Sequence, residues 1–461
     1  METAASAIAL LPNKGDTAWL IVATAFVMLM SIPGLALFYG GLVRTKNMLS
    51  VLMQVFTIFS LVSVLWAVYG YSVAFTEGNA FFGTFDKLFL NGVTPESVAA
   101  TFSKGVVVPE LVYVAFQGAF AAITVGLIVG AFAERVKFSA VLLFAVLWFS
   151  FSYLPMAHMV WYWAGPDGYT SAEAAEKLNA TAGWLFQKGA LDFAGGTVVH
   201  INAAIAGLTG AYMVGRRVGL GNVAMAPHSL TMTMIGASLL WFGWFGFNAG
   251  SALHADQSAA VVFTTTLAAG ATGALGWLAL ERLRDGHATS LGAASGMVAG
   301  LVAITPSCGS LTPVGALVMG AVAGVVCALA VGLKYRFRYD DSLDVVGVHL
   351  VGGLVGTIGI GFLASKAAPT GVAGLLDGGG VDQLGRQLVG SGVVLVYAFV
   401  ASGIIGLVVD KLIGFRIDEE HEISGIDLVV HAETAYDLHA TAGSRAAGHS
   451  VLAALTHREE D

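Results

Sequence analysis

Two stretches of the sequence decide the fold: DFAGGTVVHINAAIAG at 192–207 and DSLDVVGVHLVGGLVGTIG at 341–359. Each places a histidine, His200 or His349, within a long apolar run, directly after a valine and eight residues after an aspartate. Small residues follow each histidine at offsets of three, four, seven and ten. At this spacing they lie on one side of a helix and allow a neighbouring helix to approach closely. Because an imidazole in hydrocarbon is costly and faces a packed interior or a pathway, the matched frames predict one shared site.

The composition indicates a membrane protein. Of 461 residues, 56% are hydrophobic and 11% are charged, whereas an ordinary soluble domain has about 25% charged residues. Apolar runs near the length of about 20 residues that crosses a bilayer predict an all-α polytopic protein with eleven transmembrane helices. We expect the spans at 18–40, 47–76, 106–132, 138–163, 190–215, 229–253, 258–281, 290–305, 314–334, 345–364 and 391–414. The continuous runs do not show the strand-length alternation of a membrane barrel.

The basic residues of the loops predict the orientation. Short basic loops alternate along the chain with longer loops of mixed or acidic charge, and Lys and Arg favour the cytoplasmic side. The basic loops carry Arg44 and Lys46, Arg135 and Lys137, Arg216 and Arg217, Arg282 and Arg284, and Lys334, Arg336 and Arg338. With eleven spans, the N-terminal segment 1–17 is expected outside, the helical domain at 18–414, and the tail 415–461 in the cytoplasm.

The two histidine segments also predict an internal repeat. His200 falls in the fifth expected span, entered from outside, and His349 in the tenth, entered from inside. Spans one to five would therefore recur upside down as spans six to ten, a pattern typical of transporters whose site lies near the midplane. The alternative for each histidine is a hydrogen bond that simply joins two helices, which a matched pair makes a weaker interpretation.

Aromatic residues gather at the outer ends of the expected spans. They are Phe116, Phe120, Trp161 and Phe247, and Ser251 lies beside them. A tryptophan at this depth is commonly an interface anchor. The alternative is a weak site in which an indole face and a hydroxyl hold a small cation.

The tail 415–461 holds ten acidic residues and five of the eleven histidines, and it is too short for a core of its own. It is interpreted either as a disordered acidic tail or as a regulatory strip that docks on the inner face or on a partner.

Several long strings closely resemble the ammonium transporter (Amt) family of the Amt/Mep/Rhesus superfamily. They are GLALFYGG (34–41), AFQGAFAAITVGLIVGAFAER (115–135), AHMVW (157–161), DFAGGTVVHINAAIAG (192–207), WFGWFGFNAGSA (241–252), DVVGVH (344–349) and, in the tail, GFRIDEEHEISGID (414–427). One departure from the family's common form is the loop 164–189, which is longer than the glycine-rich link expected there.

The resemblance implies a homotrimer in the plasma (inner) membrane with one narrow apolar pore in each subunit, and no cofactor. Carried over position by position, it implies an outer ammonium recruitment site at Phe116, Trp161 and Ser251, a stacked phenyl gate at Phe120 and Phe247, a pore pair at His200 and His349, and a supporting carboxylate at Asp192. An aspartate near a helix start also serves as an N-cap, and we expect a mainly orienting role. The implied partners are ammonium or ammonia, methylammonium, the bilayer and a PII-type signalling protein at the cytoplasmic face; nucleic acid is not expected.

The expected activity follows from the cost of moving an ion into an apolar channel, tens of kcal/mol in an idealised Born estimate. Ammonium can lose a proton and cross as a neutral molecule, whereas potassium cannot. We expect deprotonation, conduction of ammonia past the histidine pair, and separate, electrogenic proton transfer. The main alternative is an ammonium sensor or transceptor that signals through the tail. A hydrolase using Ser251 and a divalent-metal carrier are weaker, because no nucleophile elbow and too few carboxylates or thiols accompany the histidines.

Overall fold

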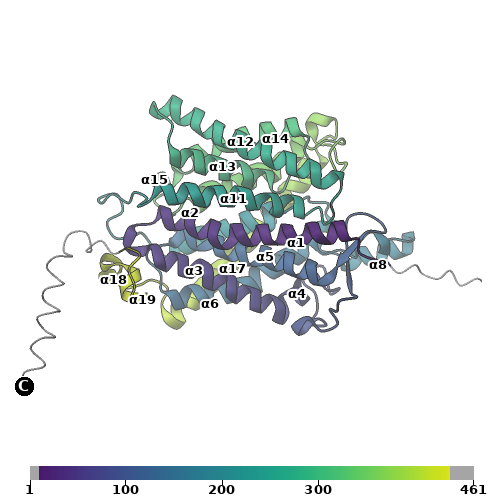
Figure 1. Cartoon of the computed structure of the whole chain (residues 1–461), viewed down its shortest axis with the longest axis horizontal. Coiled ribbons are helices and arrows are strands. Elements are labelled where there is room, and N and C mark those ends of the chain that lie inside the picture. Colours follow the sequence, from purple (N-terminus) through teal and green to yellow (C-terminus); the bar gives the residue numbers. More distant parts are fainter. Residues whose placement is uncertain (1–9, 437–461) are drawn as a thin grey trace, which may run out of the picture.

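The computed structural model describes residues 10–436. The chain forms one bundle of helices that run side by side, with their connecting segments at the two ends (Figure 1). The predicted N-terminal segment and tail therefore fall partly outside the described residues, at 1–9 and 437–461.

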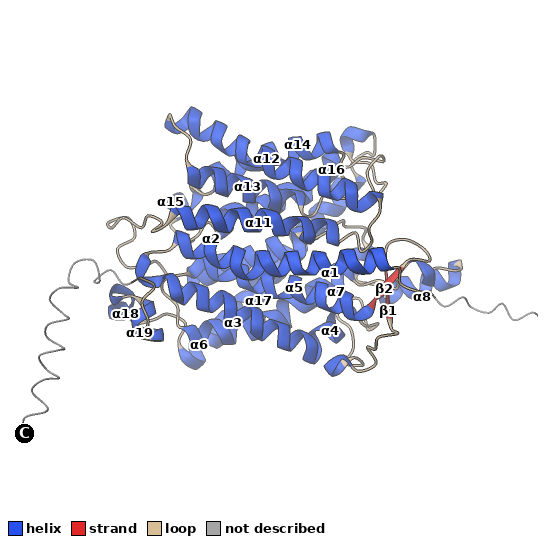
Figure 2. Cartoon of the chain, viewed as in Figure 1, coloured by secondary structure: helices blue, strands red, loops and turns tan. Residues whose placement is uncertain are grey.

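The α-helices are α1 (Lys14–Leu29), α2 (Leu35–Leu42), α3 (Met48–Leu65), α4 (Tyr71–Phe75), α5 (Glu110–Phe132), α6 (Phe138–Trp148), α7 (Leu154–Trp161), α8 (Ala172–Thr181), α9 (Trp184–Gln187), α10 (Asn202–Val214), α11 (Leu230–Gly250), α12 (Gln257–Asp285), α13 (Ser290–Ile304), α14 (Pro313–Ala330), α15 (Leu333–Phe337), α16 (Val351–Leu363), α17 (Asp382–Ile413), α18 (Glu419–Ser424) and α19 (Ile426–His431). Short 3₁₀ turns lie at Thr45–Asn47, Leu88–Leu90, Pro166–Gly168 and Leu375–Asp377. A small antiparallel hairpin of β1 (Val98–Ala100) and β2 (Val107–Pro109) lies at the end of the bundle that carries α8 (Figure 2).

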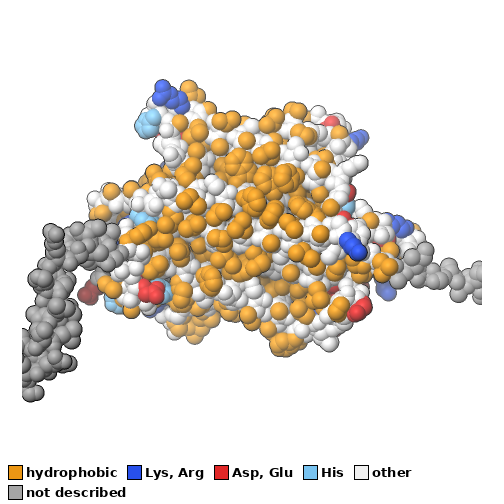
Figure 3. All heavy atoms as spheres, viewed as in Figure 1, with side chains coloured by type: hydrophobic (Ala, Val, Ile, Leu, Met, Phe, Trp, Pro, Cys, Tyr) orange, Lys and Arg blue, Asp and Glu red, His pale blue; other side chains and the backbone are white. Residues whose placement is uncertain are grey.

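Within residues 10–436, ten helices are long and apolar enough to cross a membrane. They correspond to ten of the predicted spans, and the eighth, expected at 290–305, is the shorter apolar helix α13. Hydrophobic side chains cover the middle of the visible surface, and most of the Lys, Arg, Asp and Glu side chains lie toward the two ends (Figure 3). This distribution fits a multi-pass membrane protein.

Local sequence sets several helix ends. Ser229, Thr289 and Thr312 each accept a hydrogen bond from a backbone N–H of the first turn that follows. Such caps satisfy N–H groups that have no partner within the helix. At its C-terminal end, α12 stops at Gly286, which adopts a φ of 83°, a left-handed conformation that glycine adopts without strain.

In the described part of the chain, five helical passages contain a π-helical segment, where the chain makes one wide turn. They are Met30–Gly34, Trp66–Gly70, Phe149–Tyr153, Gly196–Ile201 and Val346–Leu350. The first contains Pro33, which lacks the N–H that a regular helix needs. The last two contain His200 and His349, so the wide turns lie where the predicted pore residues are.

Two predicted boundaries were wrong for the same physical reason. The helix α17 begins at Asp382, within the predicted loop 365–390, because Gln383 and Gln387 in its first turns are polar but buried. The buried side chain of Gln387 accepts the N–H of Leu191 at 2.7 Å and donates to the Leu191 carbonyl at 2.8 Å. The fifth span begins as a helix at Gly196 rather than at 190, because the preceding residues form the loop that Gln387 holds.

Small residues bring the two histidine helices together, as the sequence predicts. A Cβ on Gly353 would lie 3.3 Å from the Cβ of His200, and a Cβ on Gly356 would overlap the carbonyl oxygen of Ala303. Larger residues at these positions would separate α16 from its neighbours.

Candidate functional site

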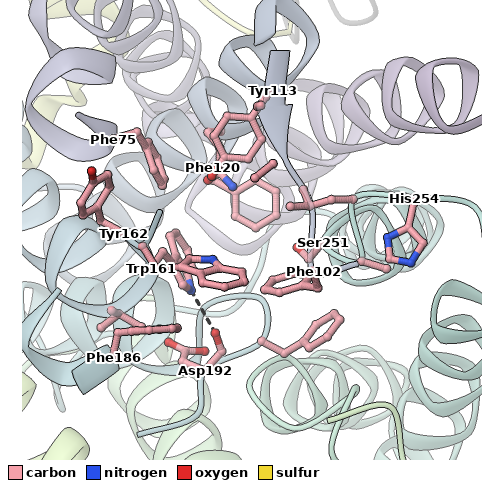
Figure 4. A pocket seen from close by; sticks show the side chains of 18 of the residues that line it. Phe75, Phe102, Tyr113, Phe120, Trp161, Tyr162, Phe186, Asp192, Ser251 and His254 are labelled. Atoms are coloured by element: carbon pink, nitrogen blue, oxygen red, sulfur yellow. Dashed lines mark hydrogen bonds between the residues drawn. The ribbon is translucent and has the colours of Figure 1, made fainter. Parts of the chain in front are cut away.

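Two vestibules and a narrow lumen lie along the bundle. The aromatic vestibule, at the α8 end, has a volume of about 630 Å³ and is lined by Phe102, Phe120, Trp161, Trp163, Phe193, Ser251 and His254, among others (Figure 4). The basic vestibule, at the α18 end, has a volume of about 660 Å³ and is lined by Arg216, Arg217, Lys334, Arg338 and Asp340, among others. Between them, the lumen is a cavity of about 10 Å³.

The predicted gate residues lie between the aromatic vestibule and the lumen. The rings of Phe120 and Phe247 are stacked, with centroids 4.0 Å apart and planes 16° apart. Phe120 lines the vestibule and Phe247 lines the lumen. Both side chains are almost completely buried, so the stacked pair separates the two spaces.

The two histidines meet in the lumen. Nδ1 of His200 lies 3.2 Å from Nδ1 of His349, and both rings are buried. The His200 ring also stacks on Trp244, with 5.7 Å between ring centroids. His349 lines both the lumen and the basic vestibule. Apolar residues make up the rest of the lumen wall: Met30, Leu35, Phe38, Ile123, Leu127, Val199, Leu240 and Val298, with the aromatic rings of Trp244 and Phe247.

The contact between two Nδ1 atoms restricts the tautomers. A neutral imidazole has one N–H and one lone pair, so one ring donates through Nδ1 and the other accepts. The ring that accepts carries its N–H on Nε2, and the ring that donates has a lone pair there. Nε2 of His200 is buried and has no hydrogen-bond partner among the described residues.

Trp161 and Ser251, for which the resemblance implies a recruitment site, both line the aromatic vestibule. The Trp161 indole and the Phe120 ring are nearly perpendicular, with 6.1 Å between centroids and 82° between planes. The Ser251 hydroxyl donates to the carbonyl oxygen of Phe247 at 2.8 Å, so its lone pairs stay free to accept. This hydroxyl bonds to a carbonyl and not to a histidine, which is not the arrangement of an activated nucleophile.

Phe116 is not placed with Trp161 and Ser251. Its side chain is fully buried next to Phe120, with 4.9 Å between the two ring centroids, and it is not among the residues that line the vestibule. Phe116 and Phe120 lie four residues apart on one side of α5, and the Phe116 ring packs against Gly250, where a Cβ would lie 2.8 Å from it.

Asp192 organises the turn before His200. Its carboxylate accepts backbone N–H groups of Gly195, Gly196, Thr197 and Val198 at 2.6 to 3.1 Å. Its own carbonyl oxygen accepts the indole N–H of Trp161 at 2.9 Å, as Figure 4 shows.

Asp341 makes the matching arrangement before His349. Its carboxylate accepts the N–H groups of Val345 at 3.0 Å and Val346 at 2.7 Å. Both histidine segments are thus anchored by a carboxylate eight residues earlier.

At the α18 end, loops that are distant in sequence meet in a buried ion-pair cluster. Arg217 contacts Glu134 at 2.6 Å and Asp340 at 2.9 Å, and Arg44 contacts Glu134 at 2.9 Å. Burial would raise the pKa of Glu134, but Arg217 and Arg44 outweigh burial and lower it below its usual value. Burial would likewise raise the pKa of Asp340, but Arg217 and Arg135 lower it below its usual value.

The first part of the tail packs against the same end. The Asp427 carboxylate accepts the N–H groups of Leu49 at 2.8 Å and Ser50 at 2.7 Å, at the start of α3. Glu422 accepts the N–H of Val218 and pairs with Arg416, both at 2.7 Å. The segment 415–436 is therefore docked on the bundle through buried residues such as Glu422 and Asp427.

Several residues around the site were not predicted. Trp244 lies three residues before Phe247, so helical spacing could have indicated that it shares the lumen wall. Phe102, Trp163 and His254 lie in loops, whose positions no periodicity gives. No group of three or more His, Cys, Asp or Glu residues in the described part of the chain has an arrangement suited to a metal ion.

The comparisons with known proteins agree with this architecture. The model of the Ammonium Transporter Family matches residues 18–436. An ammonium transporter of Mycobacterium tuberculosis (strain ATCC 25618 / H37Rv) is 50% identical over 452 residues, covering 94% of this chain and 92% of that protein.

Two solved structures have similar folds. Mep2 of Saccharomyces cerevisiae superposes with a TM-score of 0.77 at 33% identity, over 88% of this chain and 91% of the other. A structure described as Sensor Amt Protein superposes with a TM-score of 0.79 at 26% identity, over 90% of this chain and 97% of the other. The family match over nearly the whole chain, together with a half-identical relative, shows that this chain belongs to the Ammonium Transporter Family.

Proposed function

We propose that this chain transports ammonium by removing its proton and conducting ammonia through the lumen. The observation that carries the proposal is the contact of 3.2 Å between His200 and His349 in a lumen of about 10 Å³, behind a stacked phenyl pair. A volume near 10–15 Å³ admits about one molecule of water size.

The apolar wall of the lumen supports the exclusion of ions. A bare cation there would lose its hydration without gaining an oxygen ligand, at a cost of tens of kcal/mol in an idealised estimate. Potassium has no way to reduce this cost, whereas ammonium becomes neutral when it releases a proton. Selectivity would therefore reside in the chemistry of the substrate more than in the width of the pore.

Recruitment would take place in the aromatic vestibule. The Trp161 face attracts a cation through its quadrupole, by roughly 0.5 to 2 kcal/mol, and the free lone pairs of Ser251 accept one ammonium N–H. Phe116, buried next to Phe120, would support this site through packing instead of direct contact.

The histidine pair would relay the proton. When the Nε2 lone pair of one ring takes a proton, the hydrogen shared between the two Nδ1 atoms can shift, and the other ring can release its Nε2 proton. Ammonia and the proton would then move by separate steps, which gives net electrogenic transport. Asp192 would support deprotonation mainly by fixing the segment that carries His200, because four backbone N–H groups already bind its carboxylate.

The wider architecture is part of the proposal. The matching carboxylate anchors at Asp192 and Asp341 support an inverted five-helix repeat, with α13 as the eighth of eleven spans. We place the aromatic vestibule outside and the basic vestibule in the cytoplasm, since Arg and Lys favour that side. We further propose a homotrimer in the plasma membrane with one pore per subunit, which family membership supports.

A sensor that signals through the tail is the weaker candidate, although one similar structure is described as a sensor. Its support is the docking of Glu422 and Asp427 on the bundle. The same surface is where we place a PII-type partner, which a binding assay with the purified chain would test.

The experiment is a current measurement on proteoliposomes after a step in ammonium, and then in potassium at equal ionic strength. We expect a transient current with ammonium and none with potassium. Equal currents for both ions, or no ammonium current from a correctly folded protein, would contradict the proposal.

A further inference from the structure

The aromatic vestibule is much larger than ammonium requires. Its volume is about 630 Å³, whereas the lumen behind the phenyl pair is about 10 Å³. A cation can therefore be accommodated at the mouth and still be far too large to enter the lumen.

The carboxylates in the vestibule wall are already engaged. Glu110 accepts the hydroxyl of Tyr71 at 2.6 Å and pairs with Lys87, while Asp192 is held by backbone N–H groups. His254 lies 2.8 Å from Asp256 through its Nε2 atom. A strongly hydrated metal ion would find few free oxygens, and the remaining attraction comes from ring faces.

Phe102 adds a second aromatic ring to the vestibule wall, and Figure 4 shows it beside Trp161. Phe102 lies at the tip of the β1–β2 hairpin, and its side chain is 51% exposed. The ring stacks against two others. Its centroid lies 6.1 Å from that of Trp163, with 15° between the ring planes, and 6.2 Å from that of Phe193, with 26° between the planes. An exposed ring held by two others is oriented before any ligand arrives.

The long loop 164–189 holds the hairpin in place. Both carboxylate oxygens of Asp167 accept the N–H of Gly105, at 2.9 and 3.1 Å. On the other side, the Ser103 hydroxyl lies 3.4 Å from His254. These contacts hold the hairpin tip, and with it Phe102, at the wall of the vestibule that Trp161 and Ser251 also line.

We propose that the aromatic vestibule binds quaternary ammonium ions between Phe102 and Trp161 and that these ions block transport without being transported. Such an ion spreads its charge over methyl groups, is weakly hydrated, and suits aromatic faces. It has no N–H to give up, so it cannot become neutral, and it is too large for the lumen. The inference rests on the proposed function, because it assigns a second class of ligand to the recruitment site.

The test uses tetramethylammonium and the full chain in vesicles of phosphatidylethanolamine and phosphatidylglycerol. Tetramethylammonium should inhibit the ammonium current, evoke no current itself, and bind in calorimetry on the purified protein. Neutral tert-butanol, which has a similar shape, should neither inhibit the ammonium current nor bind in calorimetry. The Phe102→Leu variant should weaken inhibition and binding about two- to five-fold, the equivalent of about 0.5 to 1 kcal/mol for one exposed ring.

Two further variants sharpen the test. Phe82→Leu is the matched control, because Phe82 is 50% exposed but lines a different groove, and it should leave the inhibition constant unchanged. Asp167→Ala should weaken inhibition as Phe102→Leu does, since it releases the hairpin. Vesicles that contain phosphatidylcholine distinguish free ions from lipid headgroups of the same chemistry. If tetramethylammonium inhibits equally in these vesicles, the site takes free ions only. If it inhibits less, the choline headgroup competes for the vestibule.

An ammonium current that tetramethylammonium does not reduce would overturn this inference and leave the proposed function intact. Equal inhibition of the wild type and Phe102→Leu would overturn the role of Phe102. Calorimetric binding without any ammonium current would instead contradict the proposed function.

Discussion

Replacement of His200 by leucine tests the relay most directly. The change removes the contact of 3.2 Å with His349 and leaves the Nδ1 atom of His349 buried without a partner. An unpaired buried polar group costs about 1–3 kcal/mol, while leucine keeps apolar contact with Trp244. A loss of this size is small beside the total stability of about 5–15 kcal/mol of a typical folded protein, so the variant should remain folded.

The loss of transport should be much larger than the loss of stability. A positioned proton-transfer group typically contributes about 10²–10⁴-fold, so we expect the ammonium current of His200→Leu to fall by at least about 100-fold. His200→Asn is the matched control, because its amide can hydrogen-bond to His349 but cannot take up a proton near neutral pH. A relay predicts loss in both variants, whereas a purely structural hydrogen bond predicts that asparagine retains the current.

The assay combines proteoliposome currents with thermal unfolding of the same preparations. A His200→Leu protein that melts normally and carries the wild-type ammonium current would refute the relay. Recovery of current by asparagine alone would also refute it.

Other predictions concern the mouth and the ion-pair cluster. Trp161→Leu should change the apparent ammonium affinity in current titrations and give no potassium current; a large potassium current would place selectivity at the mouth. Arg217→Met should lower stability by about 3–5 kcal/mol, because Glu134 and Asp340 keep buried charges without their partner, and a melting temperature equal to that of the wild type would contradict this. Because the pKa values of Glu134 and Asp340 are lowered in the folded chain, their stabilisation is present above the ordinary values of 4.5 and 3.8 and is lost as the pH falls through the folded values. The melting temperature of the wild type should therefore decrease when the pH is lowered below about 4. This decrease with acid should be smaller in the Arg217→Met variant.

The histidine pair was the part of the site that the sequence predicted best. The matched ladders around His200 and His349 gave a packing reason for their meeting, and Gly353 fits closely against His200. Helical periodicity carries this information because the residues that touch lie on regular segments.

The remainder depended on structure that is not periodic. Phe102 reaches the vestibule because the hairpin pairs Ala100 with Val107, and no local pattern sets where such a loop points. Phe116, expected at the mouth, is fully buried and packs against Gly250, a contact that no sequence pattern gives. The start of α17 was missed because Gln387 finds buried hydrogen-bond partners that only the folded chain supplies.

The hydrogen bond from the Trp161 indole to the carbonyl oxygen of Asp192 has a practical consequence for protein engineering. Asp192 also anchors the turn that leads to His200, so a change at position 161 affects the conformation of the segment 192–197. A library that randomises the entrance alone would distort the deeper turn in many of its members. Diversifying both segments together keeps the bond available and separates altered ligand preference from misalignment.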